Sequence, residues 1–408
     1  MSEIVREQYL ETLVRYARSP AIVVVTGLRR VGKSTLLRQL LRRLQEQGSA
    51  FLVDMEDLAF GEIRTAQDLS EYAAALPHQE NSWLIVDEVQ LIAEWERAVT
   101  SIHGRNGVRV VVSGSNATLL GSELATRLAG RYVTLRVMPL SFAEFVKLYR
   151  HIHGGSRSRE DLFDLYRVIG GLPGLLHTDL SEDLMGQLQR DVYNTIALRD
   201  VVTRHSIRDL AGFEAVARFA MDNVGSLVSA NSIARYMKSQ GRRISVDTVL
   251  NYLVYLTEAF VFDQVPRFDI RGKRHFEVGF KYYLGDLGLR NGFFGTGERW
   301  IGGDLENLVY HELMRRGFRV GVGVIGEREI DFVAEKGDAR IYIQVAYLLA
   351  ERATRDRELR SLMDLPDAYP RVIISMDRSA PGPMNGVRHI PALDFLSGRR
   401  ILGDNSPE

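Results

Sequence analysis

A glycine-rich stretch, G-L-R-R-V-G-K-S at residues 27–34, has the residue types and spacing of a phosphate-binding loop. Its two glycines permit the tight backbone turn that points N–H groups at phosphates. The residues expected to surround a nucleotide are Gly27, Leu28, Arg29, Arg30, Val31, Gly32, Lys33, Ser34 and Thr35. Among them, Lys33 is expected to reach the β- and γ-phosphates and act in catalysis, and Ser34 to bind Mg²⁺.

The segments on either side of this loop have the composition that such a loop requires. Residues 21–26 form a short β-branched run, typical of a buried strand, and residues 33–47 have the periodicity of an amphipathic helix. A helix that begins at the loop adds its positive N-terminal end to the attraction for an anion. Only six of the 52 basic residues are lysines, so Lys33 indicates a need for an ammonium in place of a guanidinium.

A second candidate element follows the apolar run 82–86, where the chain reads Asp87-Glu88. An acid at the end of a buried strand, downstream of a phosphate loop, is the second half of a nucleoside triphosphatase site. We expect Asp87 to hold the Mg²⁺ shell and Glu88 to polarise an attacking water. The adjacent glutamate favours water as the nucleophile, and therefore a hydrolase over a kinase.

The next apolar run, residues 108–112, leads into the polar stretch 113–116. A polar side chain here, beside the acidic strand, could sense the γ-phosphate and orient the water. Asn116 is our candidate, although the sequence does not decide which residue of 113–116 has this role. The alternative is an ordinary helix N-cap by Ser115 or Asn116.

Two arginines flank Gly130 further along the chain. An arginine that completes the site of a neighbouring subunit would neutralise charge in the transition state. Arginine is so common in this chain that we interpret Arg127 as a solvated side chain. Arg131 is the candidate catalytic arginine, and this role predicts a homo-oligomer.

The composition is that of a globular protein able to form large cores. Of 408 residues, 45% are hydrophobic and 25% charged, and 52 basic residues balance 52 acidic ones, so net charge gives no global attraction to nucleic acid. The absence of cysteine excludes disulfides, a thiolate nucleophile and cysteine-bound zinc. No apolar run approaches the length of a membrane span, and the N-terminus does not resemble a signal peptide. We therefore expect a cytoplasmic protein without membrane contact.

Alternating strand and helix patterns predict an α/β fold with a mostly parallel sheet, followed by further parts. The predicted parts are a P-loop ATPase domain (1–145), a helical lid (146–209), a winged-helix-like segment (210–283) and a C-terminal α/β nuclease-like domain (284–408). Nine basic and five acidic residues between 231 and 281 make nucleic-acid binding possible there. The alternative for this winged-helix-like segment is protein contact or a structural lid.

The C-terminal part has acids in a pattern that resembles the restriction-endonuclease-like fold. Glu306 lies in a helical segment, Asp331 in a strand, and a second strand contains Gln344 and Ala346. In that fold the second strand ends in Glu-x-Lys, so glutamine replaces the acid and alanine the lysine. Lys336 falls in the predicted turn between the strands, badly placed to substitute. We therefore predict a domain without nuclease activity that acts as a binding or assembly module.

Several longer motifs together resemble the AAA+ ATPases of bacteria and archaea that carry a C-terminal domain of unknown function. The N-terminal motifs are TGLRRVGKST, LIVDEVQ, VSGSNATLL, LAGRY followed by MPLSFAEF, and GGLP; the C-terminal ones are YLGDLGLRN, LENLVYHEL, EIDFVAE and YIQVAY. The resemblance covers nearly the whole chain. It implies an ATPase fold, Mg²⁺-ATP as cofactor and self-association through Arg131, and it leaves the cellular task open.

Three functional hypotheses follow from these observations. The first is an ATP-hydrolysing switch or motor whose C-terminal half binds a protein or nucleic-acid partner. The second is a nucleotide-gated scaffold with slow turnover, and the third is a nuclease-ATPase that processes nucleic acid. Asp87 and Glu88 favour the first over the second, and the missing Glu-x-Lys argues against the third.

Overall fold

The chain forms two compact units. The computed structural model describes residues 4–77, 81–103, 105–117, 128, 130–272, 274–295, 297–326 and 328–399. Unit 1 comprises Met1–Pro139, Leu172–His177 and Glu258–Phe260, and unit 2 comprises Leu140–Gly171, Thr178–Thr257 and Val261–Glu408. The predicted nucleotide-binding residues lie in unit 1, and the acids of the C-terminal part lie in unit 2.

Unit 1 is built on a five-stranded sheet. Its strands are β1 (Ile22–Thr26), β2 (Ser49–Asp54), β3 (Ser82–Asp87), β4 (Val108–Gly114) and β5 (Tyr132–Arg136). Their order is β2-β3-β4-β1-β5, and all four pairings are parallel. β1 and β3 are buried along their whole length, as expected when helices cover both faces of a parallel sheet. The predicted α/β fold with a parallel sheet is confirmed for this unit.

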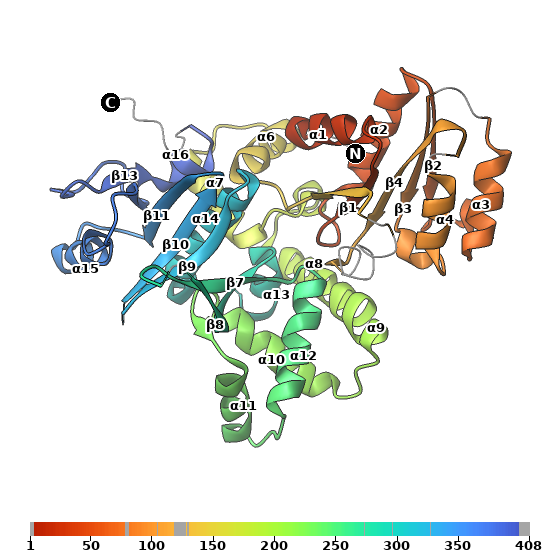
Figure 1. The fold of residues 1–408 in the computed structure, drawn as a ribbon. Coiled ribbons are helices and arrows are strands. Elements are labelled where there is room, and N and C mark those ends of the chain that lie inside the picture. The colour runs from red at the N-terminus through yellow and green to blue at the C-terminus, as the bar shows by residue number, and fades with distance from the viewer. Residues whose placement is uncertain are drawn as a thin grey trace. The chain divides into compact units, whose positions relative to one another are not determined.

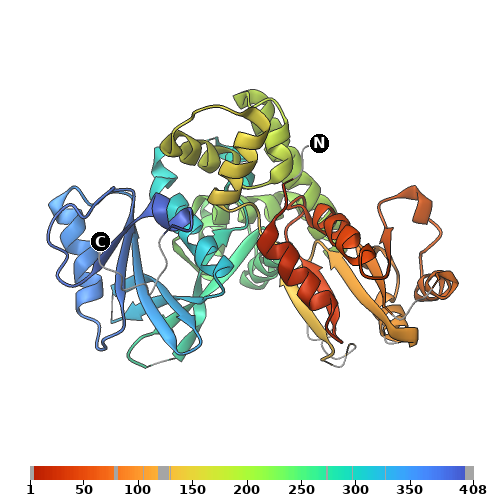
Figure 2. The same ribbon diagram turned by 90° about the horizontal axis from the view of Figure 1, so that it is seen from above.

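Helices cover both faces of this sheet (Figures 1 and 2). One face carries α1 (Glu7–Ala17) and α2 (Lys33–Gln45), and the other carries α3 (Ala66–Ala75) and α4 (Trp95–Ile102). Short 3₁₀ turns lie at Leu58–Phe60, Val89–Leu91 and Arg105–Gly107. Leu69 of α3 and Val99 of α4 belong to the core on Val86 and Val110 of the strands. Two layers of buried apolar residues thus fix the strand ends that carry the candidate site.

The first part of unit 2 is helical, as the composition predicts. Its helices are α6 (Phe142–His153), α7 (Arg159–Ile169), α8 (Glu182–Thr195), α9 (Thr203–His205) and α10 (Leu210–Asp222); a π-helical segment (Ile196–Val202) joins α8 to α9, and a 3₁₀ turn (Pro173–His177) belongs to unit 1. Ser141 and Ser158 start α6 and α7 in capping boxes with Glu144 and Asp161. In each box the serine and the acid satisfy backbone N–H groups that the helix leaves unpaired.

A strand, two helices and a hairpin follow α10. They are β6 (Leu227–Val228), α11 (Ala230–Ser239), α12 (Val246–Glu258), β7 (Phe262–Asp269) and β8 (Arg274–Leu284). β7 and β8 pair as an antiparallel hairpin, and β6 pairs with β8 on its other side. The segment 210–283 therefore contains three paired strands, of which β7 and β8 are the longest.

This hairpin continues into an eight-stranded sheet. The remaining strands are β9 (Arg319–Ile325), β10 (Arg328–Lys336), β11 (Ala339–Ala346), β12 (Arg371–Ser375) and β13 (Arg388–Pro391). The order is β13-β12-β11-β10-β9-β7-β8-β6. A parallel pairing of β7 with β9, at residues 267–269 and 322–324, joins the hairpin to the C-terminal strands. The predicted boundary between the winged-helix-like segment and the C-terminal domain falls between residues 283 and 284. Strands from both of these predicted parts lie in this one sheet.

Helices pack on both faces of the C-terminal strands (Figure 1). The helices are α13 (Leu287–Phe294), α14 (Ile301–Arg315), α15 (Arg352–Met363) and α16 (Ala392–Leu396), with a 3₁₀ turn at Glu298–Trp300. Tyr310 of α14 stacks on Tyr283 of β8, with ring centroids 4.6 Å apart, and also contacts Phe332 of β10. Leu359 of α15 belongs to a core with Val333, which follows Phe332 and so faces the opposite side of the sheet.

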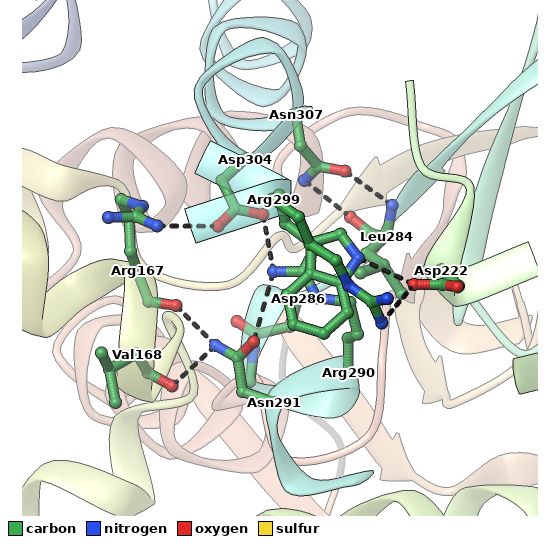
Figure 3. A network of polar contacts seen from close by, with 12 residues as sticks. Arg167, Val168, Asp222, Leu284, Asp286, Arg290, Asn291, Arg299, Asp304 and Asn307 are labelled. Atoms are coloured by element: carbon green, nitrogen blue, oxygen red, sulfur yellow. Dashed lines mark hydrogen bonds and ion pairs between the residues drawn. The ribbon is translucent and has the colours of Figure 1, made fainter. Parts of the chain in front are cut away.

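A buried ionic network connects α7, α13 and α14 in unit 2 (Figure 3). Arg290, only 1% exposed, donates to Asp304 at 2.6 Å, and Arg167 donates to the other oxygen of Asp304 at 3.2 Å. Asn291 donates to the carbonyl oxygen of Arg167 at 2.7 Å, and the Arg290 guanidinium lies 4.6 Å from the Trp300 ring. Because an unpaired buried charge is costly, this network strongly favours one packing of the three helices.

A search of the described residues finds no helix that is both long and apolar enough to cross a lipid bilayer.

Candidate nucleotide site

The loop between β1 and α2 has a backbone that only particular residues can adopt. Gly27 has φ +145°, and a Cβ atom there would lie 2.1 Å from the carbonyl oxygen of Val137. Gly32 has φ +96°, and a Cβ atom there would lie 3.9 Å from its nearest neighbour. Glycine is therefore required at this position by the backbone conformation and not by lack of space. Arg30 is held at φ +67°, in the left-handed region. These angles produce the turn that the motif predicts.

Lys33 lies inside this loop. Its side chain is buried, and the ammonium donates to the carbonyl oxygens of Gly27 at 3.0 Å and Leu28 at 3.2 Å. Lys33 is also the first residue of α2, whose first turn contains no acid. The positive end of the helix and the ammonium therefore act at the same place, which suits a bound phosphate.

The other loop residues are placed as follows. Leu28 and Val31 are buried and anchor the loop in the core, whereas Arg30 is exposed. Ser34 and Thr35 are half-buried in the first turn of α2. An ion pair of 2.6 Å joins Arg29 to Glu56, just beyond β2. This pair, which sequence reasoning did not anticipate, ties the loop to the segment just after β2, at the far side of the sheet from β5.

Asp87 and Glu88 lie at the same edge of the sheet as the loop. In a parallel sheet the carboxyl ends of the strands meet at one edge, and ligands of open α/β sheets bind there. Thr26, the last residue of β1, pairs with Gly114 of β4, and Val86 of β3 pairs with Val112 of β4. Asp87 and Glu88 are 1% and 7% exposed. The structure therefore brings both halves of the predicted site to one edge.

The end of β4 orients the two acids. The Ser113 hydroxyl donates to Asp87 and accepts from the backbone N–H of Glu88 at 3.2 Å. The Ser115 hydroxyl donates to Glu88 at 3.4 Å, and the Gln90 side chain donates to the same Glu88 oxygen. Sequence reasoning chose Asn116 from this stretch. Asn116 is fully buried here, and the two serines are the residues seen to hold the acids.

Ser34 and Asp87 have the chemistry that Mg²⁺ requires. A hydroxyl and a carboxylate are hard oxygen donors, and Mg²⁺ in nucleotide sites takes only one or two protein ligands besides phosphates and water. Consistent with so few protein ligands, the described residues contain no group of three or more His, Cys, Asp or Glu side chains suited to holding a metal ion. The donor set therefore fits a magnesium ion that arrives with a nucleotide.

Arg131 does not join the site of its own chain. It is exposed, and its carbonyl oxygen accepts from the N–H of Ile22, the first residue of β1. Arg131 therefore lies at the amino edge of the sheet, one strand length of about 13 Å from the loop edge. Arg136 is the last residue of β5 and pairs with Thr26, so it lies at the carboxyl edge of the sheet, where the loop is. The sequence analysis did not identify this arginine. Arg127 lies outside the described residues.

The acids of unit 2 form a separate cluster. The N–H of Asp331 on β10 donates to the Gln344 side-chain oxygen on β11 at 3.3 Å, and the Gln344 amide donates to Glu358 at 2.8 Å. Gln344 is thus engaged within the protein. Lys336 donates to the carbonyl oxygen of Arg316 at 2.7 Å, at the end of β10, and does not reach these acids.

A lysine that sequence reasoning missed lies in this cluster. Lys281 of β8 places its ammonium 2.8 Å from Glu306, 2.7 Å from Glu329 and 3.4 Å from Asp331. Burial, together with the Asp331 charge, raises the pKa of Glu306 to about 7. Burial alone would lower the pKa of Lys281, but the three acids raise it above its ordinary value. The sequence signal that could have identified Lys281 is its position as a single lysine among the apolar and aromatic residues at the end of β8.

Comparison with known proteins gives two family matches and a solved structure with a similar fold. Residues 19–146 match a family described as an AAA domain, and residues 160–299 match a domain of unknown function (DUF8612). The Walker-type ATPase PABY2304 of Pyrococcus abyssi has a similar fold, with a TM-score of 0.52 and 16% identity over 71% of this chain and 95% of that one. The family match and the fold support an AAA-type ATPase, and residues 27–34 have the sequence of a phosphate-binding loop.

Two relatives match most of the chain. An uncharacterized protein of Haemophilus influenzae is 34% identical over 399 residues, which are 96% of this chain and 98% of that protein. Uncharacterized protein MJ1544 of Methanocaldococcus jannaschii is 28% identical over 356 residues, 83% of this chain and 77% of that protein. The chain belongs to the family of the Haemophilus influenzae protein.

Proposed function

We propose that the protein hydrolyses Mg²⁺-ATP in unit 1 and works as a switch or motor for a partner bound by its C-terminal half. The observation that carries this proposal is the single sheet edge at which the Lys33 loop meets Asp87 and Glu88. Residues 27–35 bind the phosphates, and Ser34 and Asp87 hold Mg²⁺. The metal ion supplies charge neutralisation at the phosphates.

The hydrolytic step assigns a role to each remaining residue. Glu88 accepts a proton from the attacking water: Ser113 donates to the Asp87 carboxylate, whereas the hydrogen bonds from Ser115 and Gln90 to Glu88 both go to its Oε2 and leave Oε1 for the water. Ser115 and Gln90 fix its carboxylate. Asn116, which follows the end of β4, is the proposed γ-phosphate sensor. Loss of any of these side chains is expected to lower turnover more than nucleotide affinity.

Steady-state ATP hydrolysis of the purified protein, with and without Mg²⁺, tests this proposal. Lys33→Ala should abolish hydrolysis because phosphate binding is lost. Lys147→Ala is the matched control, since Lys147 is an exposed lysine on α6. A Lys33→Ala variant that hydrolyses ATP at the wild-type rate contradicts the proposed site. A nucleotide-gated scaffold, the alternative, predicts tight ATP binding with turnover too slow to respond to a partner.

The segment 210–283 supports a partner-binding role. Its order α10-β6-α11-α12-β7-β8, with β6 paired to β8, supports the proposal of a winged helix. Exposed basic side chains lie on α11 and the turn after it: Arg235, Lys238, Arg242 and Arg243. The exposed face of α12, a helix described in full, carries Asp247, Leu250, Asn251 and Val254 and no base. We infer that nucleic acid would contact α11 and that α12 is better suited to protein.

We further propose that the nuclease-like C-terminal part is catalytically inactive. Gln344 is bound to Glu358 and Lys336 lies away from the acids. We expect no cleavage of single- or double-stranded DNA or RNA with Mg²⁺ or Mn²⁺. Cleavage that disappears in Asp331→Ala would instead support the nuclease-ATPase alternative. Because ATP is the fuel, a cytoplasmic location is part of the same proposal.

A further inference from the structure

Three carboxylates in unit 2 surround the side-chain ammonium of Lys281. The Lys281 side chain is 2% exposed, and those of Glu306 and Asp331 are 13% and 11% exposed. The third acid, Glu329, is 33% exposed and lies where the cluster meets solvent. Three acids therefore converge on a single ammonium group, so the cluster has more negative than positive charge when all its members are ionised.

The other polar contacts of the cluster hold the carboxylates toward this ammonium. The Tyr283 hydroxyl donates to Glu306 at 2.6 Å, and the N–H of Val345 donates to the second oxygen of Asp331 at 2.8 Å. A Cβ atom on Gly225 would lie 3.1 Å from the second oxygen of Glu306, so the chain packs closely there. The acids thus have fixed positions on two different elements, α14 and β10.

The distances are those of ion pairs between an ammonium and carboxylates. The three N···O distances run from 2.7 to 3.4 Å. The residue is also a lysine in a chain where six of 52 basic residues are lysines. A compact ammonium on a flexible stem can contact three carboxylates at once, whereas a planar guanidinium is shaped for paired contacts in one plane.

We propose that Lys281 is the built-in cation of this cluster: its ammonium replaces a divalent metal ion as the counter-charge that joins β8, α14 and β10. The consequence is a latent metal site. Without the ammonium, the acids of α14 and β10 face one another with unbalanced charge, and a divalent cation that enters past Glu329 restores the balance. This inference does not depend on ATP hydrolysis in unit 1.

The test is Mn²⁺ binding to the nucleotide-free, full-length protein, measured by electron paramagnetic resonance of the free ion and by thermal unfolding with and without Mn²⁺. The wild type is compared with Lys281→Ala, with Asp331→Asn, with Lys281→Ala/Asp331→Asn and with Lys147→Ala. Lys147 is an exposed lysine on α6, so its variant controls for the simple loss of a positive charge. The double variant locates any new binding at the cluster.

We expect Lys281→Ala to bind one Mn²⁺ per chain at least about tenfold more tightly than the wild type, with a rise in unfolding temperature on addition of Mn²⁺. The double variant should lose both effects, and Lys147→Ala should behave as the wild type. Equal Mn²⁺ binding by wild type and Lys281→Ala would overturn the proposal. Wild-type binding that Asp331→Asn removes would also overturn it, because Lys281 would then neighbour a metal and not replace one.

A second variant covers the case in which Lys281→Ala fails to fold. Lys281→Gln keeps most of the side-chain length and its hydrogen-bond donors without the charge. If Lys281 is the counter-charge, this variant should also gain Mn²⁺ binding and thermal stabilisation by Mn²⁺. A folded Lys281→Gln protein that is indifferent to Mn²⁺ contradicts the proposal as firmly as an indifferent Lys281→Ala protein.

Discussion

Glu88 has a backbone conformation that few residues other than glycine adopt. Its φ of +52° and ψ of +47° cost a non-glycine residue about 1–3 kcal/mol. The conformation is compatible with hydrogen bonds from Ser115 and Gln90 to its carboxylate and with a bond from its own N–H to Ser113. Such strain is found at functional sites, and here it directs the proposed base away from the strand while Asp87 stays in line with it.

Ser113 orients Asp87, the proposed magnesium ligand. Its hydroxyl donates to Asp87, so Ser113→Ala should leave the proposed magnesium ligand poorly oriented. Loss of such an orienting partner lowers metal affinity by about 10- to 100-fold. We expect the Mg²⁺ concentration for half-maximal ATP hydrolysis to rise by a factor in this range. The measurement is a Mg²⁺ titration of the ATPase rate at saturating ATP.

Ser115→Ala is the matched control for this titration. The Ser115 hydroxyl donates to Glu88, the proposed base, so its loss should lower kcat without changing the Mg²⁺ requirement. An unchanged Mg²⁺ requirement in Ser113→Ala would show that Asp87 does not bind the metal through this arrangement.

Sequence alone could place the loop and the acids, because each is a local pattern after a buried strand. It could not place Ser113, Ser115 or Arg136. Their contacts depend on which strands are neighbours, and β4 lies between β1 and β3 although it follows both in the chain. The same pairing puts Arg131 at the wrong edge for its own site, which no local pattern could reveal.

At the scale of elements, Asp286 connects the start of α13 to the end of α7. It accepts from the backbone N–H of Gly288 at 2.9 Å as an N-cap and from that of Gly171 at 2.6 Å. A Cβ atom at Gly170 would lie 1.9 Å from the Asp286 carboxylate, so close packing requires glycine at this position. Burial raises the pKa of Asp286 to about 7, although the two N–H groups and Arg315 act in the opposite direction.

This pKa predicts a pH-dependent stability. Unfolded Asp286 has a pKa of about 3.9, so between pH 4 and 7 the folded chain retains a proton that the unfolded chain has lost. Its contribution is fully present below about pH 4 and is lost as pH rises through 7. Asp286→Asn, which does not titrate, should therefore show a smaller fall in unfolding temperature from pH 5 to 8 than the wild type.

Asp164→Asn is the control for this comparison, because Asp164 is an exposed acid on α7 and its side chain is 65% exposed. Its unfolding temperature should follow that of the wild type across the pH range. If Asp286→Asn also follows the wild type, Asp286 is ionised in the folded protein throughout, and its burial does not control the pH dependence.

The elements were predictable to different degrees. Strand runs alternating with helices identify the parallel sheet of unit 1, and the segment 227–284 has the local pattern of two helices and a hairpin. The pairing of residues 267–269 with 322–324, which merges that hairpin into a longer sheet, has no local signal. Hydrophobic alternation fixes which face of a strand is buried, and it leaves open which distant strand lies beside it.

At the scale of the whole molecule, the position of Arg131 makes self-association a requirement of its proposed role. It is exposed at the amino edge of the unit 1 sheet, opposite its own phosphate loop. An arginine there could neutralise charge on ATP only in another subunit. Self-association in the presence of ATP is therefore part of the proposed function.

Mixing of two inactive variants tests this idea. Arg131→Ala should lower turnover without weakening ATP binding, and Lys33→Ala should bind no ATP. A mixture should regain part of the activity, because one subunit supplies the intact loop and the other supplies Arg131. Hydrolysis and sedimentation of the mixture, with ATP present, are the measurements. A strictly monomeric protein with full activity would exclude a role for Arg131 in a neighbour's site.

The central claim is that Glu88 is the base of an ATPase, and Glu88→Gln tests it most directly. The variant should bind ATP as the wild type does, while turnover falls by a factor of about 10²–10⁴, the usual contribution of a positioned base. Glu94→Gln is a close control, since Glu94 has the same φ of +52° yet is exposed and paired with Arg97. The account predicts a large loss of turnover in Glu88→Gln alone; hydrolysis by this variant at the wild-type rate would contradict it.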